Sequence, residues 1–94
     1  MQIKDINVTH DLKRKRFEIK IDTHTAELAY YINGDIIVFT HTGVPPALEG
    51  QGIGSMLVKT GLQYAKENNL KVESTCWFVS RYIDRHPEFR DLAE

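Results

Sequence analysis

Residues 50–55 read GQGIGS, and the pattern of the chain changes on either side of this glycine-rich run. Residues 36–40 (IIVFT), upstream, form an apolar run typical of a buried strand. Downstream, apolar residues recur at helical spacing from Ile53 to Ala65. A strand, a glycine turn and a helix in this order aim main-chain N–H groups and a helix N-terminus at an anion. The run therefore predicts a site for a phosphate-bearing cofactor.

Two common phosphate-binding motifs fit the run poorly. A P-loop needs Gly-Lys-Ser/Thr at its end, whereas this chain has Gly54, Ser55 and Met56 there. A dinucleotide-binding fold needs glycine in place of Ser55 and two linked βαβ halves, and only about 40 residues follow. Glu73 does lie roughly 20 residues on, where a ribose-binding acid is expected. A structural interpretation also stays open, in which the glycines simply make a tight turn.

Length, charge and cysteine content limit the class of protein. The 94 residues suffice for a single domain, 1–94, with one modest core. The formal net charge of -1 gives no general attraction for nucleic acid or for an acidic membrane surface. A single cysteine excludes an internal disulfide, and no apolar run is as long as a signal peptide or a membrane span. We expect a cytoplasmic protein that is a monomer or a weak homodimer and binds neither nucleic acid nor membrane.

Hydrophobic patterning predicts an α/β (α+β) fold with a mixed sheet and the order β-β-β-β-α-β-α. The predicted strands are residues 3–8, 17–21, 26–32, 36–40 and 70–74, and the predicted helices are residues 53–67 and 77–85. The first strand rests on Ile3, Ile6 and Val8, and the second alternates apolar residues with Glu18 and Lys20, as in a half-buried strand.

The connections between these elements are predicted from turn residues and from topology. Asn33-Gly34 predicts a two-residue hairpin turn, because both residues tolerate positive φ. Residues 36–40 and 70–74 are expected to pair in parallel, since a helix separates them. The basic run at residues 13–16 (KRKR) is interpreted as a solvated turn and not as a nucleic-acid patch.

Four short stretches follow one another in an informative order. They are residues 41–44 (HTGV), 49–54 (EGQGIG), 76–79 (CWFV) and 86–89 (HPEF). Together they resemble the GCN5-related N-acetyltransferases, and in particular the smallest, stand-alone members of that family. The resemblance spans nearly the whole chain and implies that family's minimal fold, acetyl-CoA as co-substrate and acetyl transfer to an amine acceptor. It implies that the cofactor is bound by Val44, Gly50, Gln51, Gly52, Ile53, Gly54 and Ser55.

The chain departs from the family pattern in two places. Glu49 stands where the family has Gln or Arg, and a carboxylate beside a diphosphate is unfavourable unless it points into water. Larger members of the family also carry helices between their first two strands, whereas the corresponding segment here is only residues 8–16. We therefore expect weakened coenzyme A binding if Glu49 faces the ligand, and an open, shallow site for the acceptor.

Three residues are candidates for the chemistry. Cys76 is a possible nucleophile, since a thiolate can take the acetyl group and the helix that begins at Trp77 lowers its pKa. His41 is a possible base, expected to face the same cleft, and Tyr82 a possible acid for the departing thiolate. Each also has a structural interpretation: Cys76 and Tyr82 as core residues, and His41 as a hydrogen-bonding loop residue. The histidines have no ligand-like spacing with the cysteine, so no metal site is expected.

Three classes of function follow from these observations. The first is an acetyl-CoA-dependent N-acetyltransferase acting on a small amine or an exposed lysine. The second is a module that binds coenzyme A or acetyl-CoA without efficient turnover. The third is a protein-interaction domain that keeps only the fold. Covalent chemistry at Cys76 separates the first class from the second, and binding of coenzyme A separates the second from the third.

Overall fold

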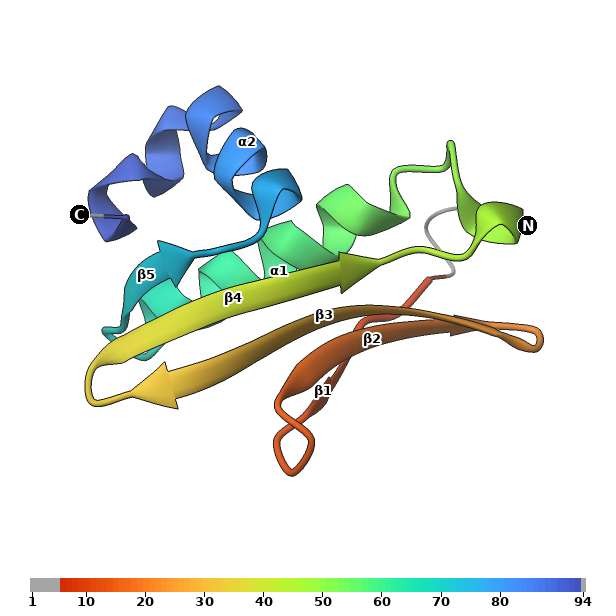
Figure 1. Ribbon diagram of the computed structural model, residues 1–94, viewed down its shortest axis with the longest axis horizontal. Coiled ribbons are helices and arrows are strands. Elements are labelled where there is room, and N and C mark those ends of the chain that lie inside the picture. Colours follow the sequence, from red (N-terminus) through yellow and green to blue (C-terminus); the bar gives the residue numbers. More distant parts are fainter. Residues whose placement is uncertain (1–5, 94) are drawn as a thin grey trace.

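The computed structural model describes residues 6–93, which fold as a sheet with helices packed against it (Figure 1). The strands are β1 (Thr9–Asp11), β2 (Arg16–Ile21), β3 (His24–Asn33), β4 (Ile36–Gly43) and β5 (Lys71–Ser74). The helices are α1 (Ile53–Glu67), α2 (Trp77–Arg85) and the short 3-10 helices η2 (Pro46–Leu48) and η3 (Pro87–Leu92). The predicted order β-β-β-β-α-β-α and the α/β class are confirmed. No helix within residues 6–93 has the length and apolar character needed to cross a membrane.

The strands lie in the spatial order β1-β2-β3-β4-β5. Strands β1 to β4 are antiparallel neighbours, and β5 runs parallel to β4, as the crossover through α1 requires. The hairpin between β3 and β4 turns one residue later than predicted. Asn33 pairs with Ile36 in the ladder, and the turn consists of Gly34, whose φ is 63°, and Asp35.

The first strand lies later in the chain than predicted. Ile6 and Val8 precede β1, and Ile3 lies outside the described residues. A tight turn in which Lys15 has a φ of 58° joins β1 directly to β2. Pairing with β2 defines β1, and polar residues can supply that pairing as well as apolar ones. Residues 12–15, which join β1 to β2, form a turn.

Helix α1 covers one face of the sheet and buries an apolar stripe there. The buried residues of that stripe are Ile53, Leu57, Val58, Leu62 and Ala65. Gly61 lets the helix approach the strands closely, because a Cβ at this position would lie 2.9 Å from the ring of Phe39 and 3.0 Å from Leu28. Helix α2 packs beside α1 and β5, so the start of α2 comes close to the start of α1.

A β-bulge at Thr40 changes the direction of the side chains along β4. Tyr30 pairs with Phe39, but the preceding residue, Ala29, pairs with His41, so β4 contains one extra residue at Thr40. Such an extra residue reverses the alternation of side chains beyond it. Phe39 faces α1, whereas His41 faces the opposite side of the sheet. Thr42, the next residue, faces the side of α1 again.

Strand β4 continues beyond its pairing with β5. Within the described residues the β4–β5 ladder ends at the pair Phe39–Ser74. The N–H of Thr75 still donates to the carbonyl of Phe39 at 3.0 Å, and beyond this bond the two chains separate. The bulge and the separation thus occur at the same level of the sheet, and they leave the last residues of β4 beside an opening.

Candidate functional site

A cleft of about 470 Å³ opens where β4 and β5 separate, between the glycine loop and the start of α2. It is lined by Thr42, Val44, Glu49, Gly50, Gly52, Ile53, Gly54, Ser55, Trp77 and Phe78. The lining includes the residues predicted to bind the cofactor, apart from Gln51, which is exposed beside the cleft. The glycine run and two residues of the CWFV stretch, Trp77 and Phe78, therefore form one concave surface although they lie far apart in the sequence.

The glycine loop exposes main-chain donors. Gly50 and Gly52 have φ values of 82° and 76°, in the left-handed region that favours glycine. Gly52 is the N-cap of α1, and among the described residues no side chain caps this helix and no acidic residue lies in its first turn. The first N–H groups of α1 therefore lack helical partners. Among the described residues, no atom lies within 4 Å of a Cβ built at Gly50 or Gly52, so an anionic group such as a diphosphate fits against the loop.

The glycine at position 54 has a different role. A Cβ at Gly54 would lie 2.9 Å from the ring of Phe78, so this glycine permits the start of α2 to pack on the start of α1. The close packing brings Trp77 and Phe78 to the side of the cleft opposite the loop.

The thiol of Cys76 lies at the edge of the cleft. Cys76 follows β5 and is the N-cap of α2, and its Sγ lies 3.4 Å from Oγ1 of the cleft residue Thr42. Partial burial raises the pKa of this thiol, but the Thr42 hydroxyl and the N–H groups of Val79, Phe78 and Thr42 outweigh it, so that the pKa lies below its ordinary value. A lowered pKa makes this cysteine a better nucleophile at neutral pH.

The side chain of His41 lies on the opposite face of the sheet. Its Nε2 is 3.8 Å from Oε2 of Glu27, and its side chain is 62% exposed. Glu27 neighbours Leu28 on β3, and Leu28 faces α1, so Glu27 and His41 share the face away from α1. The prediction that His41 faces the same cleft as Cys76 is wrong, because the bulge at Thr40 turns His41 away.

Tyr82 lies in the core and is 9% exposed. Its ring stacks on that of His86, with 3.8 Å between centroids and 11° between planes. Burial, with a smaller contribution from the charge of Glu88, raises the pKa of its hydroxyl. Tyr82 does not line the cleft formed by the described residues, so its role as an acid for the departing thiolate stays a prediction.

Thr42, Trp77 and Phe78 line the cleft but were not predicted as site residues. Trp77 is 70% exposed although it is a large aromatic residue, and the guanidinium of Arg81 lies 5.2 Å from its ring centroid. Thr42 contacts the thiol. All three belong to the stretches HTGV and CWFV, so their nearness in sequence to His41 and Cys76 was the available signal. Within residues 6–93, no three His, Cys, Asp or Glu side chains gather as metal ligands would.

The fold and the cleft define a class of protein: a mixed α/β sheet in which β4 and β5 separate beside a glycine loop and a cysteine. Residues 16–92 match the family model described as GCN5-related N-acetyl-transferase, so the chain belongs to this family of acyltransferases. It is 36% identical to Protein NATD1 of Gallus gallus over 85 residues, which are 87% of this chain and 77% of that protein. It is 35% identical to Protein NATD1 of Homo sapiens over 85 residues, 87% of this chain and 75% of that protein.

A solved structure supports the same assignment. The NMR solution structure of a GCN5-like protein from Staphylococcus aureus superposes with a TM-score of 0.74 at 29% identity, over 96% of this chain and 89% of that chain. The resemblance inferred from the four short stretches and the minimal fold expected from it are thus confirmed.

Proposed function

We propose that this chain transfers the acetyl group of acetyl-CoA to an amine and that Cys76 carries the acetyl group between the two. The observation that carries the proposal is the thiol of Cys76, which has a lowered pKa and lies 3.4 Å from Thr42 at the edge of the cleft. The glycine loop lines the same cleft. A donor bound by its diphosphate at the loop and extended along β4 brings its thioester to this thiol.

The donor is held mainly by backbone. The diphosphate of coenzyme A lies against the N–H groups of residues 50–55 at the start of α1. Its pantetheine arm follows the end of β4, beyond the last pair with β5, where backbone groups are available. Val44 and Trp77 supply apolar surface on either side of the arm.

The acetyl group moves to the protein in one substitution. The Cys76 thiolate attacks the carbonyl carbon of the acetyl thioester, a new C–S bond forms, and the bond to the coenzyme A sulfur breaks. The released coenzyme A thiolate takes a proton from water. The hydrogen bonds that lower the pKa of Cys76 supply the thiolate for the attack.

Binding and acetylation can be measured separately, because the chain has one tryptophan and one cysteine. Trp77 lines the cleft, so its fluorescence should change on titration with coenzyme A. Incubation with acetyl-CoA should add one acetyl mass, located at Cys76 by peptide mapping. Gly52→Asp should abolish the fluorescence change, because it places a side chain and a negative charge against the diphosphate.

A matched variant controls for folding. Gly34 also has a positive φ, 63°, but it lies in the hairpin and not in the cleft. Gly34→Asp should therefore bind coenzyme A as the unmodified chain does. A chain that shows no fluorescence change at millimolar coenzyme A, or equal binding by Gly52→Asp and the unmodified chain, contradicts the proposed donor site.

Binding of coenzyme A without turnover is the second candidate, and the position of His41 favours it, because this predicted base faces away from the cleft. Glu49 lines the cleft beside the glycine loop, where its carboxylate weakens the binding of a diphosphate in either candidate. The mass measurement separates the two candidates: coenzyme A binding with no acetylated Cys76 and no acetyl transfer to any amine supports the binding module.

A further inference from the structure

A second hollow, of about 530 Å³, lies on the sheet face opposite α1. It is lined by Arg14, Arg16, Glu18, Lys20, Thr25, Glu27, Gly43, Val44 and Pro45. Val44 also lines the cleft, so the end of β4 separates the two hollows. Gly43 leaves room for the His41 ring on this face, because a Cβ there would lie 3.0 Å from Nε2 of His41.

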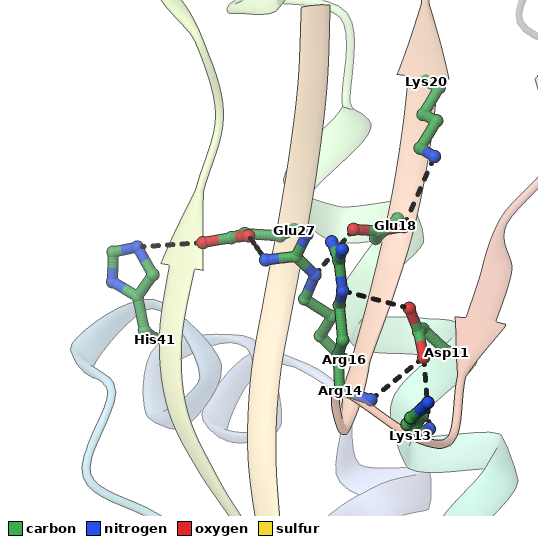
Figure 2. A network of polar contacts seen from close by, with 8 residues as sticks. All are labelled: Asp11, Lys13, Arg14, Arg16, Glu18, Lys20, Glu27 and His41. Atoms are coloured by element: carbon green, nitrogen blue, oxygen red, sulfur yellow. Dashed lines mark hydrogen bonds and ion pairs between the residues drawn. The ribbon is translucent and has the colours of Figure 1, made fainter.

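The floor of the hollow is a row of charged side chains from neighbouring strands (Figure 2). Arg16 lies between two carboxylates: its Nε is 2.6 Å from Oε2 of Glu18, and its Nη1 donates to Oε1 of Glu27 at 2.7 Å. Glu18 is 4% exposed, whereas Lys20, which follows it on the same face of β2, is exposed. The Arg16 charge is thus committed to holding both carboxylates in place.

The remaining charges of the hollow are available to a ligand. Oε2 of Glu27 is 3.8 Å from His41, which is longer than a hydrogen bond. Nζ of Lys20 lies 3.9 Å from Oε1 of Glu18, and Nε of Arg14 lies 3.8 Å from Oδ2 of Asp11. The side chains of Lys20 and Arg14 are 68% and 67% exposed. A ligand with an ammonium group at Glu27 and an anionic group at one of the exposed cations would complement this surface.

We propose that this hollow binds the acetyl acceptor and that the acceptor is a small amine that also carries a carboxylate, as an amino acid does. The inference rests on the proposed function, since it names the acceptor of the same reaction. Among the described residues that line the hollow, basic side chains outnumber acidic ones, which disfavours polyamines and other polycations. The acceptor ammonium lies at Glu27 and its carboxylate at Lys20 or Arg14.

The position of His41 fits the acceptor side. His41 lies on the same face beside Glu27, so its imidazole can take the proton of the acceptor ammonium. The neutral amine nitrogen then attacks the acetyl carbon on Cys76 across the end of β4. The N–C bond forms, the C–S bond breaks, and the thiolate of Cys76 is restored while the second proton of the amine passes to water.

The selectivity for a carboxylate is tested with pairs of acceptors. Acetyl-CoA consumption is measured with L-alanine, with L-alaninamide and with spermidine. The loss of one charge-assisted contact predicts a kcat/KM for L-alaninamide about tenfold below that for L-alanine, with spermidine below both. Arg14→Gln and Lys20→Gln should reduce this preference. Lys13 is a neighbouring basic residue that does not line the hollow, so Lys13→Gln should leave the preference for L-alanine unchanged.

A binding measurement keeps this inference separate from the proposed function. L-Alanine added without acetyl-CoA should shift the amide resonances of Thr25 and Gly43, and L-alaninamide should shift them less. If acetyl-CoA neither binds nor acetylates Cys76, the proposed function is wrong, and the amide shifts alone then show whether the hollow binds L-alanine. The absence of shifts, or equal or faster transfer to L-alaninamide or spermidine than to L-alanine, overturns the inference.

Discussion

Replacing Thr42 by Val tests whether the hydroxyl of Thr42 controls the reactivity of Cys76. The hydroxyl lies 3.4 Å from the sulfur and donates to it when the thiol is ionised. Valine keeps the shape of the side chain and removes the donor. The charged form then loses a stabilising contact while the neutral form loses little, so the pKa of Cys76 must rise.

The magnitude follows from the length of the contact. A hydrogen bond to a charged group contributes about 1.5–3 kcal/mol at good geometry. At 3.4 Å to a sulfur atom, we expect about 1 kcal/mol from this contact. The pKa should therefore rise, and about 1 kcal/mol corresponds to about a fivefold change in the ionisation constant. At a pH well below the pKa, the thiolate fraction should fall about fivefold.

The assay is the rate of alkylation by iodoacetamide as a function of pH, which reports Cys76 alone because the chain has one cysteine. The unmodified chain should show an inflection below the ordinary thiol value of about 8.5, and Thr42→Val should move it to higher pH. Thr40→Val is the control, since the Thr40 hydroxyl bonds the carbonyl of Ala29. Identical profiles for Thr42→Val and the unmodified chain, or an inflection at the ordinary value in both, would refute the reasoning.

Three further substitutions test the packing and the charges. Gly61→Ala places a Cβ 2.9 Å from a buried ring, so the free energy of unfolding should fall by about 1–3 kcal/mol in urea denaturation; unchanged stability would mean that α1 can shift. Glu49→Gln removes a negative charge from the cleft and should tighten coenzyme A binding several-fold by Trp fluorescence, whereas Glu67→Gln at the far end of α1 should not. Arg16→Gln removes the counter-charge of the Glu18 side chain, which is 6% exposed, and should cost about 3 kcal/mol of stability, seen as a lower Tm. A Tm equal to that of the unmodified chain would contradict this account of the buried carboxylate.

Local patterns in the sequence determined the helices and the glycine loop. The helix predicted at residues 77–85 is α2 (Trp77–Arg85), which ends before Pro87 as the residue types require. Helix α1 begins at Ile53, directly after Gly52, as the glycine run predicted. Helical period, turn residues and proline act within a few neighbours along the chain, and for this reason they could be recognised without any knowledge of the fold.

Tertiary structure alone decided which face of the sheet each side chain of the site occupies. The single extra residue at Thr40 sends His41 to the face of Glu27 and leaves Thr42 beside Cys76, and no residue type in the stretch HTGV marks that bulge. Pairing with β2 likewise created β1 from polar residues, and Arg16 made the burial of a carboxylate possible. The physical reason is common to these cases: register and charge pairing are set by contacts between strands, and those contacts join residues that the local sequence does not connect.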